Sequence, residues 1–226
     1  MMPRYQFPIL ALCVASVLTA AQAQVITAYK VQPGVVGAEP NPGENLIIGL
    51  DFDVVSSVKV VSLGVFDSKT DGIFGSELQV AILDRQTGAL VTPQLSFTSA
   101  DNGTALDGSR FKTLAAPVIL PAGFQGSVVA GAYTTPLGDP NGNAVHQPMQ
   151  WSFDDGGGLL TQVHFHYNFD YDNSGLFLPT TTHPGLPDPV FAAGTFQYEA
   201  VPEPGQFVVL FGVGLLGTAL WRRFGR

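Results

Sequence analysis

The sequence contains very little cysteine and few charged residues. Its single cysteine, Cys13, lies in an apolar segment near the N-terminus. The body after it can therefore form no internal disulfide and offers no thiol nucleophile. Charged residues make up 12% of the chain and hydrophobic residues 46%, which supplies one well-buried core and excludes a disordered chain. We expect one domain that is stabilised by packing.

Basic side chains are scarce outside the two ends of the chain. Between Gln24 and Ala200 there are 17 acidic residues and 6 basic ones, while the other four basic residues are Arg4, Arg222, Arg223 and Arg226. Nucleic acids and anionic lipid headgroups are bound largely through Lys and Arg. The composition therefore predicts no nucleic-acid partner, and it suits soluble cations or neutral glycans better.

The first 23 residues have the three parts of a signal peptide. Arg4 supplies positive charge, Phe7 to Leu18 is apolar, and Ala21-Gln22-Ala23 places small residues where a signal peptidase reads them. We expect cleavage after Ala23 and export of the rest. The alternatives are a buried N-terminal helix or an uncleaved anchor, for which the apolar run is shorter than the roughly 20 residues that a bilayer requires.

The segment 201–226 combines prolines, an apolar run and arginines. Val201-Pro202-Glu203-Pro204 is followed by fifteen uncharged residues, 207–221, and then by Arg222, Arg223 and Arg226. Fifteen helical residues span about 22 Å, short of a hydrocarbon core of ~30 Å. We expect a short transmembrane helix whose arginines stay cytoplasmic, which places the acidic body outside. The two prolines favour an extended, accessible peptide before the helix.

This tail resembles the PEP-CTERM sorting signal, which has a Pro-Glu-Pro motif, a short hydrophobic helix and a terminal basic cluster in that order. Val201, Pro202, Glu203 and Pro204 match the motif, and Arg222, Arg223 and Arg226 match the cluster. The resemblance implies processing by an exosortase, a membrane-embedded cysteine transpeptidase of Gram-negative bacteria that make exopolysaccharide. It also implies a transient inner-membrane anchor and delivery to the cell surface or the extracellular space. A Pro-Glu-Pro sequence alone would be an ordinary linker.

The region 24–200 is predicted to be one all-β domain. It has runs of β-branched and aromatic residues between Gly, Pro, Asn and Asp, and no long segment with helical spacing. Nine or ten strands predict a β-sandwich of jelly-roll type. The candidates are Leu46–Val54, Ser57–Phe66, Glu77–Leu83, Leu90–Phe97, Arg110–Leu114, Pro117–Leu120, Ser127–Tyr133, Thr161–Phe169 and Val190–Tyr198.

Three local patterns refine this expectation. In residues 46–54 the even positions are apolar, so Asp51 and Asp53 should point to a solvated face. The apolar parity changes between Val60 and Val61, which indicates a bulge or burial on both faces. The polar residues 84–88 end in glycine and predict a hairpin loop. Residues 136–148 and 177–189 are the longest loop candidates.

Part of the body, about Gly49 to Tyr133, loosely resembles a DUF4082-type domain of unknown function. The resemblance rests on Leu63-Gly64-Val65-Phe66-Asp67, Asp71-Gly72, Gln79 to Asp84, Thr87-Gly88 and Leu120-Pro121-Ala122-Gly123. It implies a β-sandwich and no assigned activity.

Two features could bind a metal ion. His164 and His166 alternate with apolar residues, so both imidazoles should share one strand face, and Asp170, Asp172 or His146 could add a third ligand. Asp170 to Gly175 has alternating oxygen donors, as calcium loops do, but lacks the later glutamate of an EF-hand. A polar strand face and an Asx-capped turn are the simpler interpretations. Residues 154–158 likewise indicate a turn, and no metal or cofactor site is predicted.

Catalytic signatures are missing from the sequence. It has no Gly-x-Ser-x-Gly elbow, no His-Glu-x-x-His motif and no phosphate-binding glycine loop. Trp151, Tyr133 and Tyr167 could form a sugar-stacking platform, although core packing also explains such aromatics. We predict a non-enzymatic surface or extracellular-matrix protein associated with exopolysaccharide or biofilm. The alternatives are a glycan- or calcium-binding module and, less favoured, a secreted hydrolase with two facing carboxylates.

Overall fold

The computed structural model describes residues 24–37, 45–74, 77–134, 151–169, 171–172, 174–182 and 193–201. Several of the predicted features lie outside these ranges. They are the signal peptide 1–23, the loop 136–148, the hydrophobic helix 207–221, the arginines 222, 223 and 226, the motif residues 202–204, and the candidate metal ligands His146 and Asp170.

The described part of the chain is all-β, as predicted, with twelve strands and one 3-10 turn, η1 (Ser68–Thr70). The strands are β1 (Ile26–Thr27), β2 (Tyr29–Val31), β3 (Asn45–Val54), β4 (Val58–Phe66), β5 (Leu78–Asp84), β6 (Leu95–Phe97), β7 (Thr104–Leu106), β8 (Ser109–Leu120), β9 (Gln125–Thr134), β10 (Trp151–Phe153), β11 (Leu160–Asn168) and β12 (Gly194–Ala200). Each long strand overlaps a predicted one. The short strands β1, β2, β7 and β10 were not predicted, because two or three residues carry too little of a period-two pattern.

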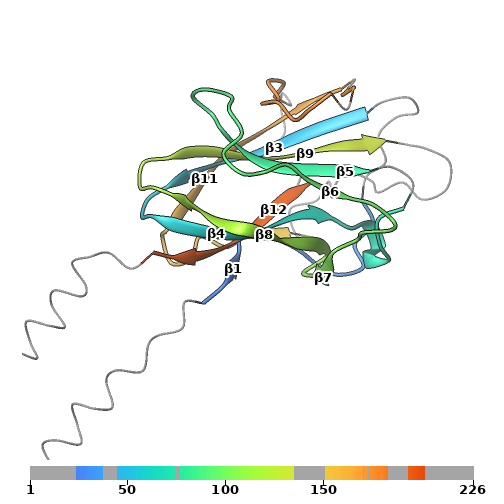
Figure 1. The fold of residues 1–226 in the computed structure, drawn as a ribbon, viewed down its shortest axis with the longest axis horizontal. Coiled ribbons are helices and arrows are strands. Elements are labelled where there is room, and N and C mark those ends of the chain that lie inside the picture. Colours follow the sequence, from blue (N-terminus) through green and yellow to red (C-terminus); the bar gives the residue numbers. More distant parts are fainter. Residues whose placement is uncertain are drawn as a thin grey trace, which may run out of the picture.

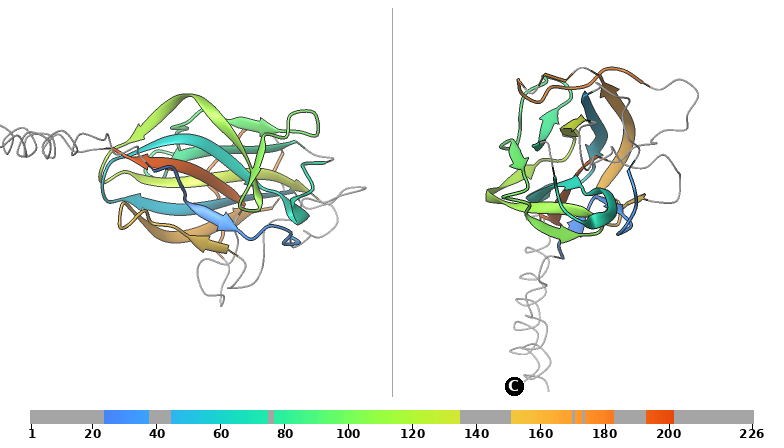
Figure 2. Two further views of the ribbon diagram at one scale, coloured as in Figure 1. Left: turned by 90° about the horizontal axis from the view of Figure 1, so that it is seen from below. Right: turned by 90° about the vertical axis from the view of Figure 1, so that its right-hand side faces the viewer.

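Two five-stranded antiparallel sheets form the body (Figure 1). The first sheet has the order β1-β12-β4-β8-β7, and the second has the order β11-β3-β9-β5-β6. Figure 2 shows the red β12 inside the first sheet, beside the blue N-terminal strand. The sheets lie in two layers, as in the predicted sandwich, and curve together into a half-barrel.

A two-stranded ribbon, β2 paired with β10, packs beside the two sheets. Tyr29 of β2 links the parts: its hydroxyl donates to the backbone oxygen of Asp51 in the second sheet at 3.4 Å, and its ring lies 6.4 Å from that of Phe196 in the first. Trp151 and Phe153 of β10 pack against the same ring, with centroids 6.0 and 5.1 Å away. The ribbon therefore closes one open side of the half-barrel with aromatic side chains.

The bulge predicted in β4 is confirmed. The pairing of β4 with β8 shifts between Val60 and Ser62, and the pairing with β12 shifts at the same place. Val60 and Leu63 both remain fully buried. The extra residue, Val61, is what lets apolar side chains on either side of the parity change reach one core.

The prediction that Asp51 points to a solvated face is wrong. Asp51 is only 6% exposed, although it lies on the outer side of the second sheet, opposite to the buried Leu50 and Phe52. This outer face is partly covered by residues 171–172 and 174–182, which come after β11 and cross back over the sheet. The hydroxyl of Tyr171 donates to Gln79 Oε1 at 2.6 Å, and Thr181 exchanges two backbone hydrogen bonds with Tyr167.

A chain of aromatic contacts joins the two sheets. The rings of Phe52 in β3 and Phe196 in β12 lie 4.9 Å apart, and Tyr198 lies 5.7 Å beyond Phe196. All three side chains are fully buried. At Gly194 the layers approach so closely that an added Cβ would lie 3.1 Å from Val128 Cγ2. The last strand of the body is therefore packed into its centre.

We predict that Phe196→Ala lowers the free energy of unfolding of the body by about 3–5 kcal/mol, because it removes a ring from the contact between the layers. Phe74→Ala is the matched control, since this ring is 44% exposed and its loss should cost no more than about 0.5 kcal/mol. Urea unfolding of residues 24–201 measures both values. Equal losses in the two variants would contradict the placement of Phe196.

Candidate functional site

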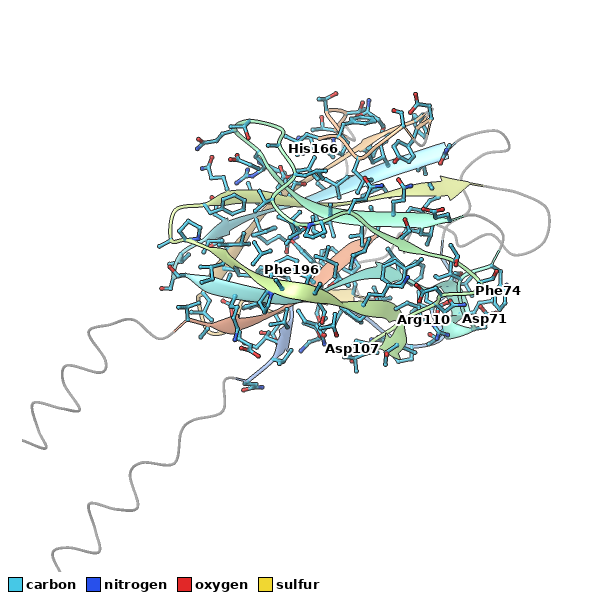
Figure 3. All side chains as sticks on the ribbon, in the orientation of Figure 1. Asp71, Phe74, Asp107, Arg110, His166 and Phe196 are labelled. Carbon is cyan, nitrogen blue, oxygen red and sulfur yellow. The ribbon has the colours of Figure 1, made fainter. Side chains whose placement is uncertain are left out.

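A polar cluster lies on the outer face of the second sheet and consists of Asp51, Asp53, Arg85, Ser127 and His166. Adjacent strands supply them: β3 carries the two aspartates, β9 carries Ser127, β11 carries His166, and Arg85 comes directly after β5. Figure 3 shows His166 on the far side of its sheet from Phe196. The period-two alternation of each strand puts these polar residues on one face while their neighbours fill the core.

Asp51 is at the centre of the polar cluster. Its Oδ2 lies 3.2 Å from His166 Nδ1 and 3.8 Å from Arg85 Nη1. Arg85 also pairs through Nη2 with Asp53 Oδ1. A buried carboxylate needs such partners, because removal from water strongly disfavours an isolated charge. Arg85 therefore places one positive charge between two aspartates, at the end of β5.

Two hydrogen-bond donors in the polar cluster have no partner within the described part of the chain: Ser127 Oγ and Arg85 Nε. Ser127 is 1% exposed and is the cross-strand partner of Asp51. Side chains of Arg85, His166 and Asp53 are 19, 25 and 41% exposed, so the cluster reaches solvent on the Asp53 side. Unpaired buried donors beside carboxylate acceptors are suited to a hydroxylated ligand or a water molecule.

The polar cluster contains the residue types of a Ser-His-Asp triad without its arrangement. Asp51 at Nδ1 of His166 matches the orientation of the acid and base. A nucleophile must also lie within hydrogen-bond reach of the base, and Ser127 Oγ makes no hydrogen bond to any described residue. Ser127 is also buried. A Cβ added at Gly49 would lie 2.7 Å from Ser127 Oγ and 3.1 Å from Pro179 Cγ, so Ser127 and Pro179 both pack over this glycine.

The two histidines lie on one side of β11, as predicted, with ring centroids 6.4 Å apart. A bulge between Gln162 and Phe165 sets their register against β3. His166 Nδ1 lies 3.2 Å from Asp51, which was not in the predicted ligand set. Among the residues that the structure describes, no three His, Cys, Asp or Glu side chains are placed to hold a metal ion.

The acidic segments are turns built by their own side chains. Oδ1 of Asp172 accepts the backbone N–H of Ser174 at 2.9 Å, and hydrogen bonds from the side chain and then the backbone of Ser174 lower the pKa of Asp172. Asp154 and Asp155 accept the N–H groups of Gly156 and Gly157 at 3.1 and 2.9 Å. The interpretation of these segments as Asx-capped turns is therefore confirmed for their described residues.

The three aromatics considered for a sugar platform do not meet. Tyr133 is fully buried and donates to the Ala193 oxygen at 3.0 Å, and burial raises the pKa of its phenol. Trp151 packs on Tyr29 in the ribbon, while Tyr167 on β11 lies 5.2 Å from Phe169. A platform made of Trp151, Tyr133 and Tyr167 is therefore wrong.

Sequence reasoning missed a buried ion pair at the far end of β4. Asp67 is fully buried, accepts Arg110 Nε at 2.6 Å and accepts the N–H of Gly72 at 3.0 Å. It holds the turn 68–72, in which Lys69 and Thr70 have φ of 62° and 63°. An aspartate directly after an apolar strand and five residues before a glycine was the available signal. Its role is structural.

The end of β12 is the second feature of functional interest. Ala200 is the last residue of β12 and pairs with Val58 of β4, and Val201 donates its N–H to the Ser57 oxygen at 3.1 Å. Pro202, the next residue, has no backbone donor. β12 ends at Ala200, and Val201 alone separates it from the Pro-Glu-Pro sequence.

Comparison with known proteins identifies the segment C-terminal to the body. Residues 200–223 match the family model of the PEP-CTERM protein-sorting motif, so the chain carries this sorting motif, as predicted. The match does not confirm the resemblance of residues 49–133 to a DUF4082-type domain, which stays a prediction. Within the described ranges no helix has the length and hydropathy of a membrane span.

A curated relative matches half of the chain. Over 116 residues, 50% of this chain, the sequence is 33% identical to UDP-GalNAc:beta-1,3-N-acetylgalactosaminyltransferase 2 of Danio rerio. This match spans 22% of that protein. The chain thus corresponds to about a fifth of the length of the relative.

We predict that Asp154→Asn removes a pH-dependent part of the stability. Lys30 Nζ lies 2.8 Å from Asp154 Oδ2 and lowers the pKa of this carboxyl. A lowered folded-state pKa stabilises the protein above the unfolded value of about 3.9, and the effect is lost as pH falls through the folded value. Wild type should exceed the variant at pH 7 by less than about 1 kcal/mol, because the pair is exposed.

Thermal unfolding at pH 7 and at pH 2.5 measures this difference, which should vanish at the lower pH. Lys30→Met is the matched partner variant and should lose the same pH-dependent increment. A constant gap between wild type and Asp154→Asn at both pH values would contradict the assignment.

Proposed function

We propose that this protein is a non-enzymatic component of the cell surface or extracellular matrix, associated with exopolysaccharide or biofilm. The sorting motif at residues 200–223 marks it as an exported substrate of an exosortase, held first by a membrane anchor and then delivered to the surface. The observation that carries the proposal is the position of this motif at the end of β12, where the match begins at the last residue of the strand. An acidic β-body is thereby delivered as a folded unit.

The boundary between β12 and the sorting motif supports delivery of the body without loss of its fold. Phe196 and Tyr198 fill the core, and the hydrogen bond of Val201 to Ser57 is the last one of this strand end within the described residues. Processing downstream of Val201 removes no described core residue. We further propose that Pro202, Glu203 and Pro204 are the recognition residues, that Arg222, Arg223 and Arg226 fix the topology, and that the body is the unit 24–200. The jelly-roll order of the strands stays a prediction.

The excess of acidic over basic residues supports the choice of environment. A surface with this charge should repel nucleic acid and anionic headgroups. It is compatible with neutral polysaccharide and with the cations that accompany anionic polysaccharide. Calcium binding at residues 170–175 stays an alternative and not a prediction, since Asp170 lies outside the described residues.

The intact mass of the exported protein tests the sorting proposal. In the native host we expect a product that lacks everything after the Pro-Glu-Pro region, and full-length protein in the inner membrane once the exosortase is deleted. Glu203→Gln should reduce processing, whereas Glu39→Gln, which alters the other Glu-Pro sequence of the chain, should not. Identical masses and locations with and without the exosortase would refute the proposal.

Glycan binding by the polar cluster is the second candidate function. It is favoured by the two unpaired donors, Ser127 Oγ and Arg85 Nε, beside the carboxylates of Asp51 and Asp53. Sugar hydroxyls both donate and accept hydrogen bonds, so they can pair with both kinds of group. The partly exposed Asp53 and Arg85 would make the first contacts.

Calorimetric titration of the body with host exopolysaccharide tests this candidate. We expect heat with wild type, at least tenfold weaker binding in an Asp53→Asn, Arg85→Gln double variant, and wild-type affinity in Lys30→Gln, which alters an exposed ion pair elsewhere. In the double variant His166 still pairs with the buried Asp51, and the melting temperature checks that the body remains folded. Flat heats for every protein would eliminate glycan binding and leave the sorting proposal intact.

A further inference from the structure

The sorting motif and the folded body share residues. The motif match begins at residue 200, and Ala200 is the last residue of β12, paired with Val58. Val201, the next motif residue, donates its N–H to Ser57 O at 3.1 Å. The first two residues of the matched motif are therefore held in the sheet while the body is folded.

The shared end of β12 is held more weakly than the rest of the strand. The N-terminal strand β1 pairs only with Gln197 and Tyr198, so within the described ranges the last residues are paired with β4 and the preceding Ser57 alone. On the outer face Glu199 Oε2 lies 2.5 Å from Lys59 Nζ, with the two side chains 17 and 39% exposed. Ala200 is exposed and Val201 half-buried. A strand end with one neighbour and little buried surface belongs to the least stable part of a fold.

We propose that the end of β12, residues 199–201, must detach from β4 before the exosortase can bind the start of the motif, so that the folded body limits its own processing. The inference rests on the proposed sorting function and adds a regulatory step to it. Extended peptides are bound through their backbone donors and acceptors. The N–H of Val201 is already used within the body, and Glu199 and Ala200 are paired with β4, so the two partners compete for this segment.

Ser57 and Lys59 act as positioning residues in this arrangement. The Ser57 oxygen holds Val201, and the Ser57 hydroxyl accepts the N–H of Ala122 at 3.2 Å, which ties the strand end to the β8–β9 turn. Lys59 holds Glu199. Opening removes these contacts but leaves Phe196 and Tyr198 in the core, so the body stays folded when the end detaches.

A disulfide across the strand end tests the proposal. Lys59 and Glu199 are direct cross-strand partners on the outer face, a separation that a disulfide can bridge with a small adjustment. The single native cysteine, Cys13, lies in the predicted signal peptide, so the exported body offers no competing thiol. We expect the Lys59→Cys, Glu199→Cys variant to be processed at least tenfold more slowly in pulse-chase experiments in the native host.

The matched control is a disulfide that leaves β12 free. Lys30→Cys, Ser152→Cys joins direct partners in the β2–β10 ribbon, and its processing rate should equal that of wild type. Each single-cysteine variant should be processed at least as fast as wild type, and Lys59→Gln about twice as fast. The melting temperature of each purified body reports whether folding is retained.

A spacer separates restricted opening from other effects of the disulfide. A spacer of four residues, Gly-Ser-Gly-Ser, between Val201 and Pro202 gives the enzyme unpaired backbone upstream of the prolines. The disulfide-locked Lys59→Cys, Glu199→Cys variant with this spacer should therefore be processed at the wild-type rate. An unchanged rate in the locked variant without the spacer would overturn the inference. A wild-type chain that stays unprocessed in the presence of exosortase would instead overturn the proposed function.

Discussion

The packing of β12 between its neighbours is the constraint on which the rest of the structure depends. Phe196 contacts Phe52 across the two layers, and Tyr198 continues the same aromatic chain. The hydroxyl of Tyr198 donates to the backbone oxygen of Asp154, directly after β10, at 2.8 Å. Without a disulfide in the body, such burial is the main source of stability. Because β12 is the last described strand, the core is complete only when the sequence next to the sorting motif is in place.

The position of β12 next to the sorting motif connects folding of the body with processing of the chain. A sorting signal attached through a flexible linker would be recognised equally well on folded and unfolded bodies. Here Ala200 and Val201 belong both to the strand and to the matched motif. Pro202 cannot donate to a strand neighbour and so marks the limit between the two uses of the chain. The same short segment therefore reports the state of the fold to whatever binds the motif.

The long strands were predictable because each carries several period-two repeats, and in β4 even the bulge was visible as a change of parity. The burial of Asp51 was not predictable. It depends on residues 171–182 crossing the sheet and on His166 and Arg85 arriving from distant strands. The prediction that His164 and His166 share a face was correct, but their chemistry depends on which side chain lies opposite. That is a property of strand order, which a single sequence does not reveal.

The polar cluster and the strand end place different demands on the body. Asp51 and Ser127 are held deep in the outer face, and the glycan-binding candidate requires a rigid sheet that keeps the unpaired Ser127 Oγ and Arg85 Nε in place. Residues 199–201 require the opposite, a strand end that opens at low cost. The two features lie on different sheets, because β3, β9 and β11 form the second and β12 lies in the first. Opening of the strand end can thus proceed while the cluster keeps its geometry, since Phe196 holds the two sheets together behind it.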